Sequence, residues 1–192
     1  MAYLRDKEQR LTKSKNAAIG QDTFKALTTG INNVAVGNFA ADALTTGICN
    51  VAIGTNALGA ATTACQNVAI GDNALGGAAV VGPENIAIGF NTMDAITSGC
   101  KNIGIGPFAL GASTTGCRNI AIGESAMAGA DVTGLNNIAI GVATMDALTS
   151  GLCNIAFGVC AMGGSTTACL NIAIGQTALG NAALVGCCNI AI

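Results

Sequence analysis

Residues 85–106 read NIAIGFNTMDAITSGCKNIGIG, so the phrase Asn-Ile-Ala-Ile-Gly begins at Asn85 and returns, with Gly in place of Ala, at Asn102. The phrase or a close variant begins at eleven asparagines between Asn16 and Asn189, at a spacing of 17 or 18 along the chain. A short period that fills a chain is the signature of stacked repeats, in which each unit is too small to bury its own apolar face. The sequence therefore predicts a repeat fold over residues 16–192.

Each unit combines a strand pattern with turn signals. β-branched residues at its second and fourth positions, such as Ile86 and Ile88, favour a strand with one buried face. Gly89 and its equivalents end that strand, where we expect a positive φ. A short Ala-Leu or Ala-Met segment and a Thr-Thr-Gly or Thr-Ser-Gly turn follow, which predicts two short strands and two turns per unit. The fold class expected is all-β, a parallel β-solenoid or β-roll of about eleven coils with one repeat unit in each coil.

A longer period overlies the short one. DALTTG, DAITSG and DALTSG begin at Asp42, Asp94 and Asp146, at a constant spacing of 52. This super-repeat of three units has two explanations, duplication of a three-unit gene segment or a geometrical module of three coils. It also allows a rival fold in which three units surround each turn and residue i stacks on residue i+52.

The asparagine that begins each unit is expected to stack on its equivalents. In a parallel stack, side-chain amides one above another can hydrogen-bond to each other and so satisfy polar groups at a tight corner. We interpret this column as a structural ladder. Its members are Asn33, Asn50, Asn67, Asn85, Asn102, Asn119, Asn137, Asn154 and Asn171.

The third position of the unit points away from the two β-branched positions and is almost always alanine. If the β-branched side chains fill the coil, this column lies outside, where small apolar residues would let another copy approach closely. We therefore expect a subunit seam in a homo-oligomer. The seam residues predicted are Ala35, Ala52, Ala69, Ala87, Ala121, Ala139, Ala156 and Ala173.

The composition argues against an enzyme. The chain has no His, only 9% charged residues, and no P-loop, nucleophile elbow or Cys-x-x-Cys pair. We expect no catalytic residue, no cofactor and no metal site. Eight of the nine cysteines fall just before a motif Asn, where they pack as small hydrophobes or form disulfides between coils or chains. No stretch is long and apolar enough to span a membrane.

The two ends suggest contacts of their own. Residues 1–15 hold five Lys or Arg and two acids, which is typical of a charged docking or capping segment but too mixed in sign for nucleic acid. The segment has no apolar signal-peptide core. Ile190 and Ile192 end the sequence in a bare motif strand, an open edge that could add another strand. We expect them to meet Ala17, in the first coil of the next subunit, so that the stack continues end to end.

NVAIGTNAL, NIAIGPFAL and NIAIGESAM resemble the repeats of trimeric autotransporter adhesin heads and, more closely, those of phage and large-virus tail-fibre-like proteins. The resemblance covers residues 16–192 and implies a β-roll, commonly trimeric, that serves as a shaft or adhesive head. We expect a structural subunit of an extracellular or virion fibre whose main partner is itself, with residues 1–15 available to an attachment site on a virion or cell surface. The alternatives are a receptor-binding head and an ice-binding solenoid built on Thr62-Thr63 and its equivalents.

Overall fold

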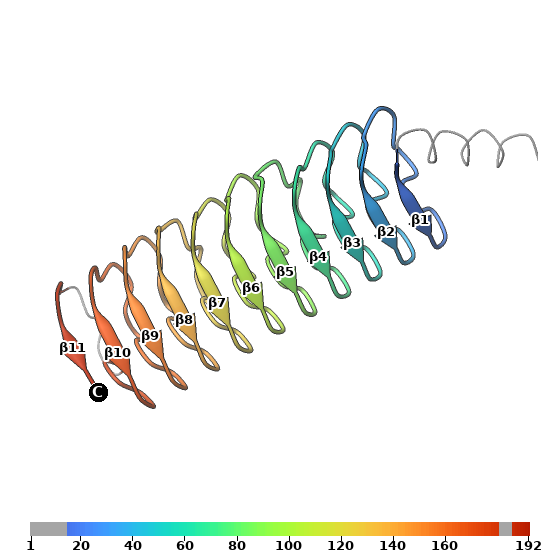
Figure 1. Cartoon of the computed structure of the whole chain (residues 1–192). Coiled ribbons are helices and arrows are strands. Elements are labelled where there is room, and N and C mark those ends of the chain that lie inside the picture. Colours follow the sequence, from blue (N-terminus) through green and yellow to red (C-terminus); the bar gives the residue numbers. More distant parts are fainter. Residues whose placement is uncertain (1–14, 181–185) are drawn as a thin grey trace, which may run out of the picture.

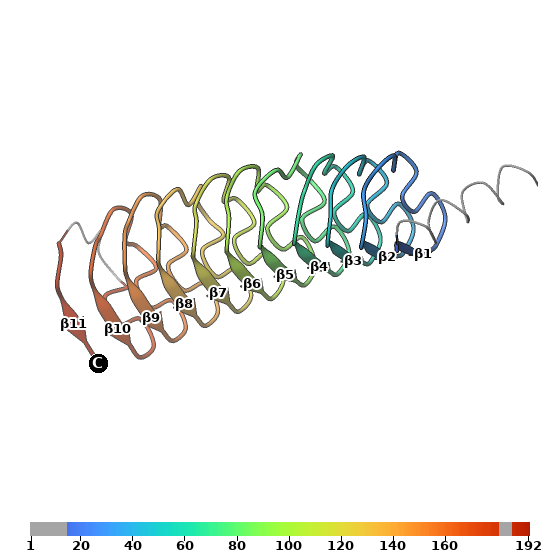
Figure 2. The ribbon, with the colours of Figure 1, turned by 45° about the horizontal axis from the view of Figure 1, so that its top comes forward.

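The computed structural model describes residues 15–180 and 186–192 and is all-β over them. Its coils stack into one rod (Figure 1), with every strand on the same side of that rod (Figure 2). The strands follow chain order, so each lies beside its sequence neighbours. They are β1 (Ala17–Ile19), β2 (Val34–Val36), β3 (Val51–Ile53), β4 (Val68–Ile70), β5 (Ile86–Ile88), β6 (Ile103–Ile105), β7 (Ile120–Ile122), β8 (Ile138–Ile140), β9 (Ile155–Phe157), β10 (Ile172–Ile174) and β11 (Ile190–Ala191).

Strand pairing confirms one coil per repeat unit. Ile86 pairs in parallel with Ile103 of the next unit, and Val68 of the unit before pairs with Ile86. The rival with three units around each turn is wrong, because every described strand pairs only with its neighbours in chain order. Ten steps of about 4.8 Å give the eleven strands a span of about 50 Å.

The motif glycine turns the chain at the end of each strand as expected, with φ between 126° and 137° from Gly20 to Gly175. The second strand predicted for each unit is absent from the described residues. Ala57 and Leu58 are consecutive and both fully buried, whereas neighbouring strand residues point to opposite faces. Leu58 has a φ of 54°, in the left-handed region, and its equivalents share this turn conformation. The backbone therefore curls, and adjacent side chains both enter the core.

The predicted orientation of the strands is wrong. The β-branched residues lie outside the coil, half-buried or exposed, and the third position lies inside. The residues assigned to a subunit seam are instead fully buried core residues within one chain. They are Ala35, Ala52, Ala69, Ala87, Ala121, Ala139, Ala156 and Ala173.

The physical reason for the alanine column is crowding from within the coil. Gly104 takes the alanine position in β6, and a Cβ built there would lie 2.9 Å from Cε of Met93 and 3.0 Å from Cγ2 of Thr92. Met93 and Thr92 lie in the repeat unit before that of Gly104, and both side chains are fully buried. Such a short coil encloses a narrow core, so the strand can place only a small side chain inside it.

Two glycines separate backbone strain from side-chain crowding. We expect Gly89→Ala to destabilise the fold by about 2 kcal/mol or more, because φ is 136° and the new Cβ would lie 2.8 Å from backbone atoms of Gly106. Gly104→Ala should cost less than about 1 kcal/mol, since only the flexible end of Met93 need move far. Denaturant unfolding of both variants checks this, and equal losses would contradict it.

Candidate interaction surface

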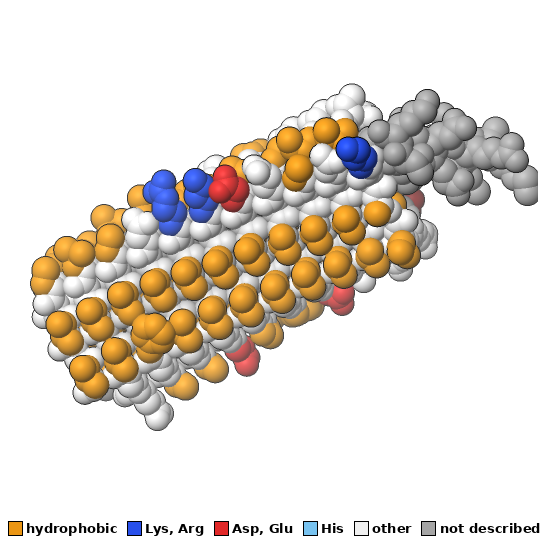
Figure 3. Space-filling view, in the orientation of Figure 1, with side chains coloured by type: hydrophobic (Ala, Val, Ile, Leu, Met, Phe, Trp, Pro, Cys, Tyr) orange, Lys and Arg blue, Asp and Glu red, His pale blue; other side chains and the backbone are white. Residues whose placement is uncertain are grey.

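The strand side of the rod presents two continuous apolar columns. Figure 3 shows them as two rows that run along the rod. No described strand carries a charged residue. Position two of the unit supplies Val34, Val51, Val68, Ile86, Ile103, Ile120, Ile138, Ile155 and Ile172. Position four supplies Val36, Ile53, Ile70, Ile88, Ile105, Ile122, Ile140, Phe157 and Ile174. We call these eighteen side chains the strand face.

The strand face is large for a surface left in water. Fourteen of its side chains are half-buried, and four are exposed at 37–42% of their surface, namely Val34, Ile53, Phe157 and Ile174. The eighteen side chains form one contiguous patch that runs along the rod from β2 to β10, whereas the largest apolar patch of a typical monomer covers about 300–600 Å². An apolar patch of that size marks a site of interaction.

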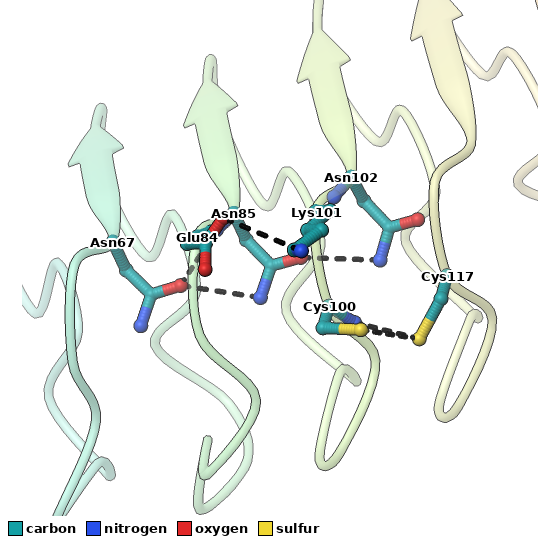
Figure 4. A network of polar contacts seen from close by, with 7 residues as sticks. All are labelled: Asn67, Glu84, Asn85, Cys100, Lys101, Asn102 and Cys117. Atoms are coloured by element: carbon teal, nitrogen blue, oxygen red, sulfur yellow. Dashed lines mark hydrogen bonds and ion pairs between the residues drawn. The ribbon is translucent and has the colours of Figure 1, made fainter.

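Buried asparagines hold the corner from which each strand leaves (Figure 4). Asn85 Oδ1 accepts hydrogen bonds from the backbone N–H and from Nδ2 of Asn102, both at 3.1 Å. Asn85 Nδ2 donates to Oδ1 of Asn67 at 3.1 Å and to the backbone oxygens of Gly82, in the turn before it, and Gly99, at 3.2 and 2.9 Å. The side chain thus bonds the coil before it, its own turn and the coil after it.

The backbone part of this ladder is unbroken. At each of the ten steps from Asn16 to Asn189, the backbone N–H of one Asn donates to Oδ1 of the Asn before it. The nine ladder residues predicted from the sequence are at most 1% exposed. Such side chains are out of reach of a ligand, so the ladder is structural.

Removing one rung should be costly. Asn102→Ala leaves the backbone N–H of Asn119 and the backbone oxygen of Gly116 without this partner, while Oδ1 of Asn85 keeps the hydrogen bond from the backbone N–H of residue 102. At about 1–3 kcal/mol for each buried group left unsatisfied, we expect a loss of about 2 kcal/mol or more in unfolding free energy. Asn38→Ala is the control, because Asn38 is exposed and its side chain accepts a single exposed hydrogen bond, from the backbone N–H of Gln21 at 3.3 Å, so that its loss should cost less than about 1 kcal/mol. Similar losses for both would contradict a ladder role.

The acidic residues of the super-repeat lie in separate coils and do not converge. Across residues 15–180 and 186–192, no group of three or more Cys, Asp or Glu is placed to hold a metal ion. Burial raises the pKa of Asp94, while hydrogen bonds from its own backbone N–H and that of Ala95 oppose the rise. The folded chain therefore favours the protonated form of this carboxyl more than the unfolded chain does.

The Asp94 shift has a definite sign in a pH titration. A folded pKa above the ordinary 3.8 means that ionisation costs stability as pH rises through that value. Asp94→Asn should therefore melt slightly above the parent at pH 7, and the gap should close below about pH 4. Glu124→Gln, at an exposed position, is the control. A pH-independent gap would count against this account of Asp94.

Ala17 and Ile190 lie on β1 and β11, the first and last described strands, and Ile192 directly follows β11. Within the described residues β1 pairs only with β2 and β11 only with β10, and Ile190 and Ile192 are 70% and 93% exposed. Ala17 is also exposed. Their contact with another subunit stays a prediction. Of the charged segment 1–15, all but Lys15 lies outside the described residues.

Sequence reasoning missed the strand face because it placed those side chains inside. The signal that could have found it is the adjacent pair of apolar residues that follows each motif glycine, such as Ala57-Leu58. Because both side chains of this pair fill the core, the core has no room for the β-branched side chains of the strand. No family model matches the chain, and comparison with curated proteins and with solved structures finds no match. No helix among the described residues is long and apolar enough to cross a membrane.

Proposed function

We propose that the chain is a structural subunit of a fibre and that its copies associate side by side through the strand face. The observation that carries this proposal is the pair of unbroken, uncharged apolar columns along the rod. A second copy of this chain is the occupant that fits best.

Periodicity supports self-association over a different partner. Both columns repeat at the spacing of the coils, about 4.8 Å, and a second copy carries the same repeat. Side chains of two copies can therefore interdigitate along the whole rod, and no charge on the strands needs to be desolvated. A closed ring of copies around an axis parallel to the rods would leave no strand face in water.

Three copies is the number that we propose, on the resemblance of the repeats to trimeric β-roll proteins. An extracellular or virion fibre is the setting that the same resemblance favours. The threonine rows behind the ice-binding alternative lie outside the strand face and are interrupted at Val81. The hydroxyls of Thr45 and Thr97 donate hydrogen bonds to backbone oxygens of the next coil. These two donors are therefore already used within the chain. No observation favours ice binding or a receptor site over assembly.

Light scattering coupled to size-exclusion chromatography tests the proposal. The parent protein should elute with three times the 18.7 kDa chain mass. Ile103→Lys combined with Ile105→Lys places two cations on the strand face and should give monomers, because assembly would bury both charges without partners. Circular dichroism should show that the coil itself persists.

The matched control places two lysines in the same part of the rod but off the strand face. Ser98→Lys combined with Thr115→Lys adds the same charge at exposed turn positions and should leave the mass unchanged. A parent protein that is monomeric at high concentration would sink the proposal. Assembly of the Ile103 and Ile105 double variant at the parent's mass would do the same.

A further inference from the structure

Two cysteines in neighbouring coils lie in contact. Cys100 and Cys117 hold the same place in adjacent units, just before the corner asparagines, and both are half-buried. The Sγ atoms are 2.7 Å apart, with the thiol of Cys100 donating to Cys117 (Figure 4). The backbone N–H of Cys100 also donates to Cys117 Sγ, at 3.1 Å. Cys117 Sγ is thus the acceptor in both bonds, and its own thiol donates to the backbone oxygen of Thr115 at 3.6 Å.

The backbone around this pair suits a covalent bond. The N–H of Arg118 donates to the backbone oxygen of Cys100 at 2.9 Å, so the two segments run in parallel register at this place. Parallel neighbours lie about 4.8 Å apart, within the range of about 4.4–6.8 Å between Cα atoms that disulfides span. Closing the bond therefore needs side-chain rotation and no movement of the coils.

The other cysteines of this column do not share the geometry. Backbone hydrogen bonds to the coils before and after it place Cys65 between Ile48 and Pro83. Its thiol donates to the backbone oxygen of Thr63 at 3.3 Å. Cys169 is bridged through its backbone to Cys187, but its thiol donates to the backbone oxygen of Thr167. Among the described residues, Cys100 and Cys117 are the pair whose sulfur atoms meet.

We propose that Cys100 and Cys117 form a disulfide that staples two neighbouring coils, by exchange with a small-molecule disulfide such as oxidised glutathione. Cys117 Sγ, as thiolate, attacks one glutathione sulfur, and the other glutathione leaves as thiolate and takes up a proton. Cys100 Sγ then gives up its proton to water and attacks Cys117 Sγ. The mixed disulfide breaks, and the second glutathione leaves as thiolate and is protonated in turn. Two protein thiols are oxidised, and one glutathione disulfide is reduced to two thiols.

The charges nearby bear on the second step. The hydrogen bond to Cys117, together with burial, raises the pKa of the Cys100 thiol, whereas Arg118 and Lys101 act to lower it. A charge on Cys117 would also raise the pKa of the Cys100 thiol, and formation of the mixed disulfide at Cys117 removes that effect. The cations then favour ionisation of Cys100 beside its target sulfur. Nζ of Lys101 also lies 3.8 Å from Oε2 of Glu84, in a solvent-exposed ion pair.

Trypsin digestion of the full chain makes the bond easy to locate. Cleavage after Lys101 and Arg118 releases residues 102–118, a peptide in which Cys117 is the single cysteine. The protein is equilibrated at low concentration with oxidised or reduced glutathione, alkylated, digested and analysed by mass spectrometry. After oxidation, we expect peptide 102–118 to be joined to residues 26–101, and after reduction to be alkylated at Cys117.

Variants identify the partner within residues 26–101, which also contain Cys49 and Cys65. Cys100→Ser should abolish the link, whereas Cys65→Ser, in the same column, should leave it intact. A link that survives Cys100→Ser, a link to residues 119–192, or a Cys117 that stays alkylatable in oxidised glutathione would overturn the proposal.

Stability supplies a second readout. A disulfide that closes a loop of this length restricts the unfolded chain, and we expect the oxidised protein to melt about 5–10 °C above the reduced protein. The shift should vanish in Cys100→Ser and persist in Cys65→Ser. An oxidised protein that carries the bond without any shift would show that it is no staple.

Discussion

The fold depends on hydrogen bonds that each coil makes with the coils on either side of it. A strand as short as Ile86–Ile88 cannot stand alone, and its partners are the equivalent strands of the coils before and after it. The corner asparagine extends the same dependence to side chains, because Asn85 bonds the coils that contain Asn67 and Asn102. Every coil is therefore a template for the next, and register errors would break the ladder as well as the strand pairing.

In-register stacking also explains the surface. Because equivalent residues lie above one another, any position that faces outward becomes a column along the whole rod. The β-branched residues that suit a strand, such as Ile103 and Ile105, thereby become a continuous apolar face. A single exposed isoleucine would need no explanation, but eighteen aligned apolar side chains do. The same stacking brings Cys100 and Cys117 together, since equal positions in adjacent coils become neighbours.

The spacing of Asn85, Asn102 and their equivalents was enough to predict a parallel solenoid and the asparagine ladder, whereas the choice between stacking at 17 or 18 residues and stacking at 52 residues came from the strand pairing. It could not predict which side of the strand is inside, because both sides are apolar and alternation alone has no direction. The side that faces inward is decided by the segment after the motif glycine, such as Ala57-Leu58. There, residues with left-handed backbone conformation, such as Leu58, turn two adjacent side chains inward, and these fill the core. The sequence analysis interpreted that segment as a second strand, and it therefore assigned the isoleucine side chains to the core.

The three-unit period corresponds to a change in the size of a core side chain, and not to the number of repeat units in each turn of the solenoid. One inward position holds Leu44, Ile96 and Leu148 in the first coil of each super-repeat, and Ser113 and Ser165 in two of the second coils. In the longer third coils, Val80 and Val132 are the buried residues of that segment. The size of the side chain at this wall of the core therefore repeats every three coils along the rod.

The most direct test of the account is a side-chain-resolution structure of the assembled protein, by crystallography or electron cryomicroscopy. In that structure, we expect Ala87 and Ala121 to lie inside their own coils and Ile86 and Ile88 to contact the strand face of a neighbouring copy. A structure in which the alanine column lies at the boundary between copies, or in which the strand face remains in solvent, would contradict it.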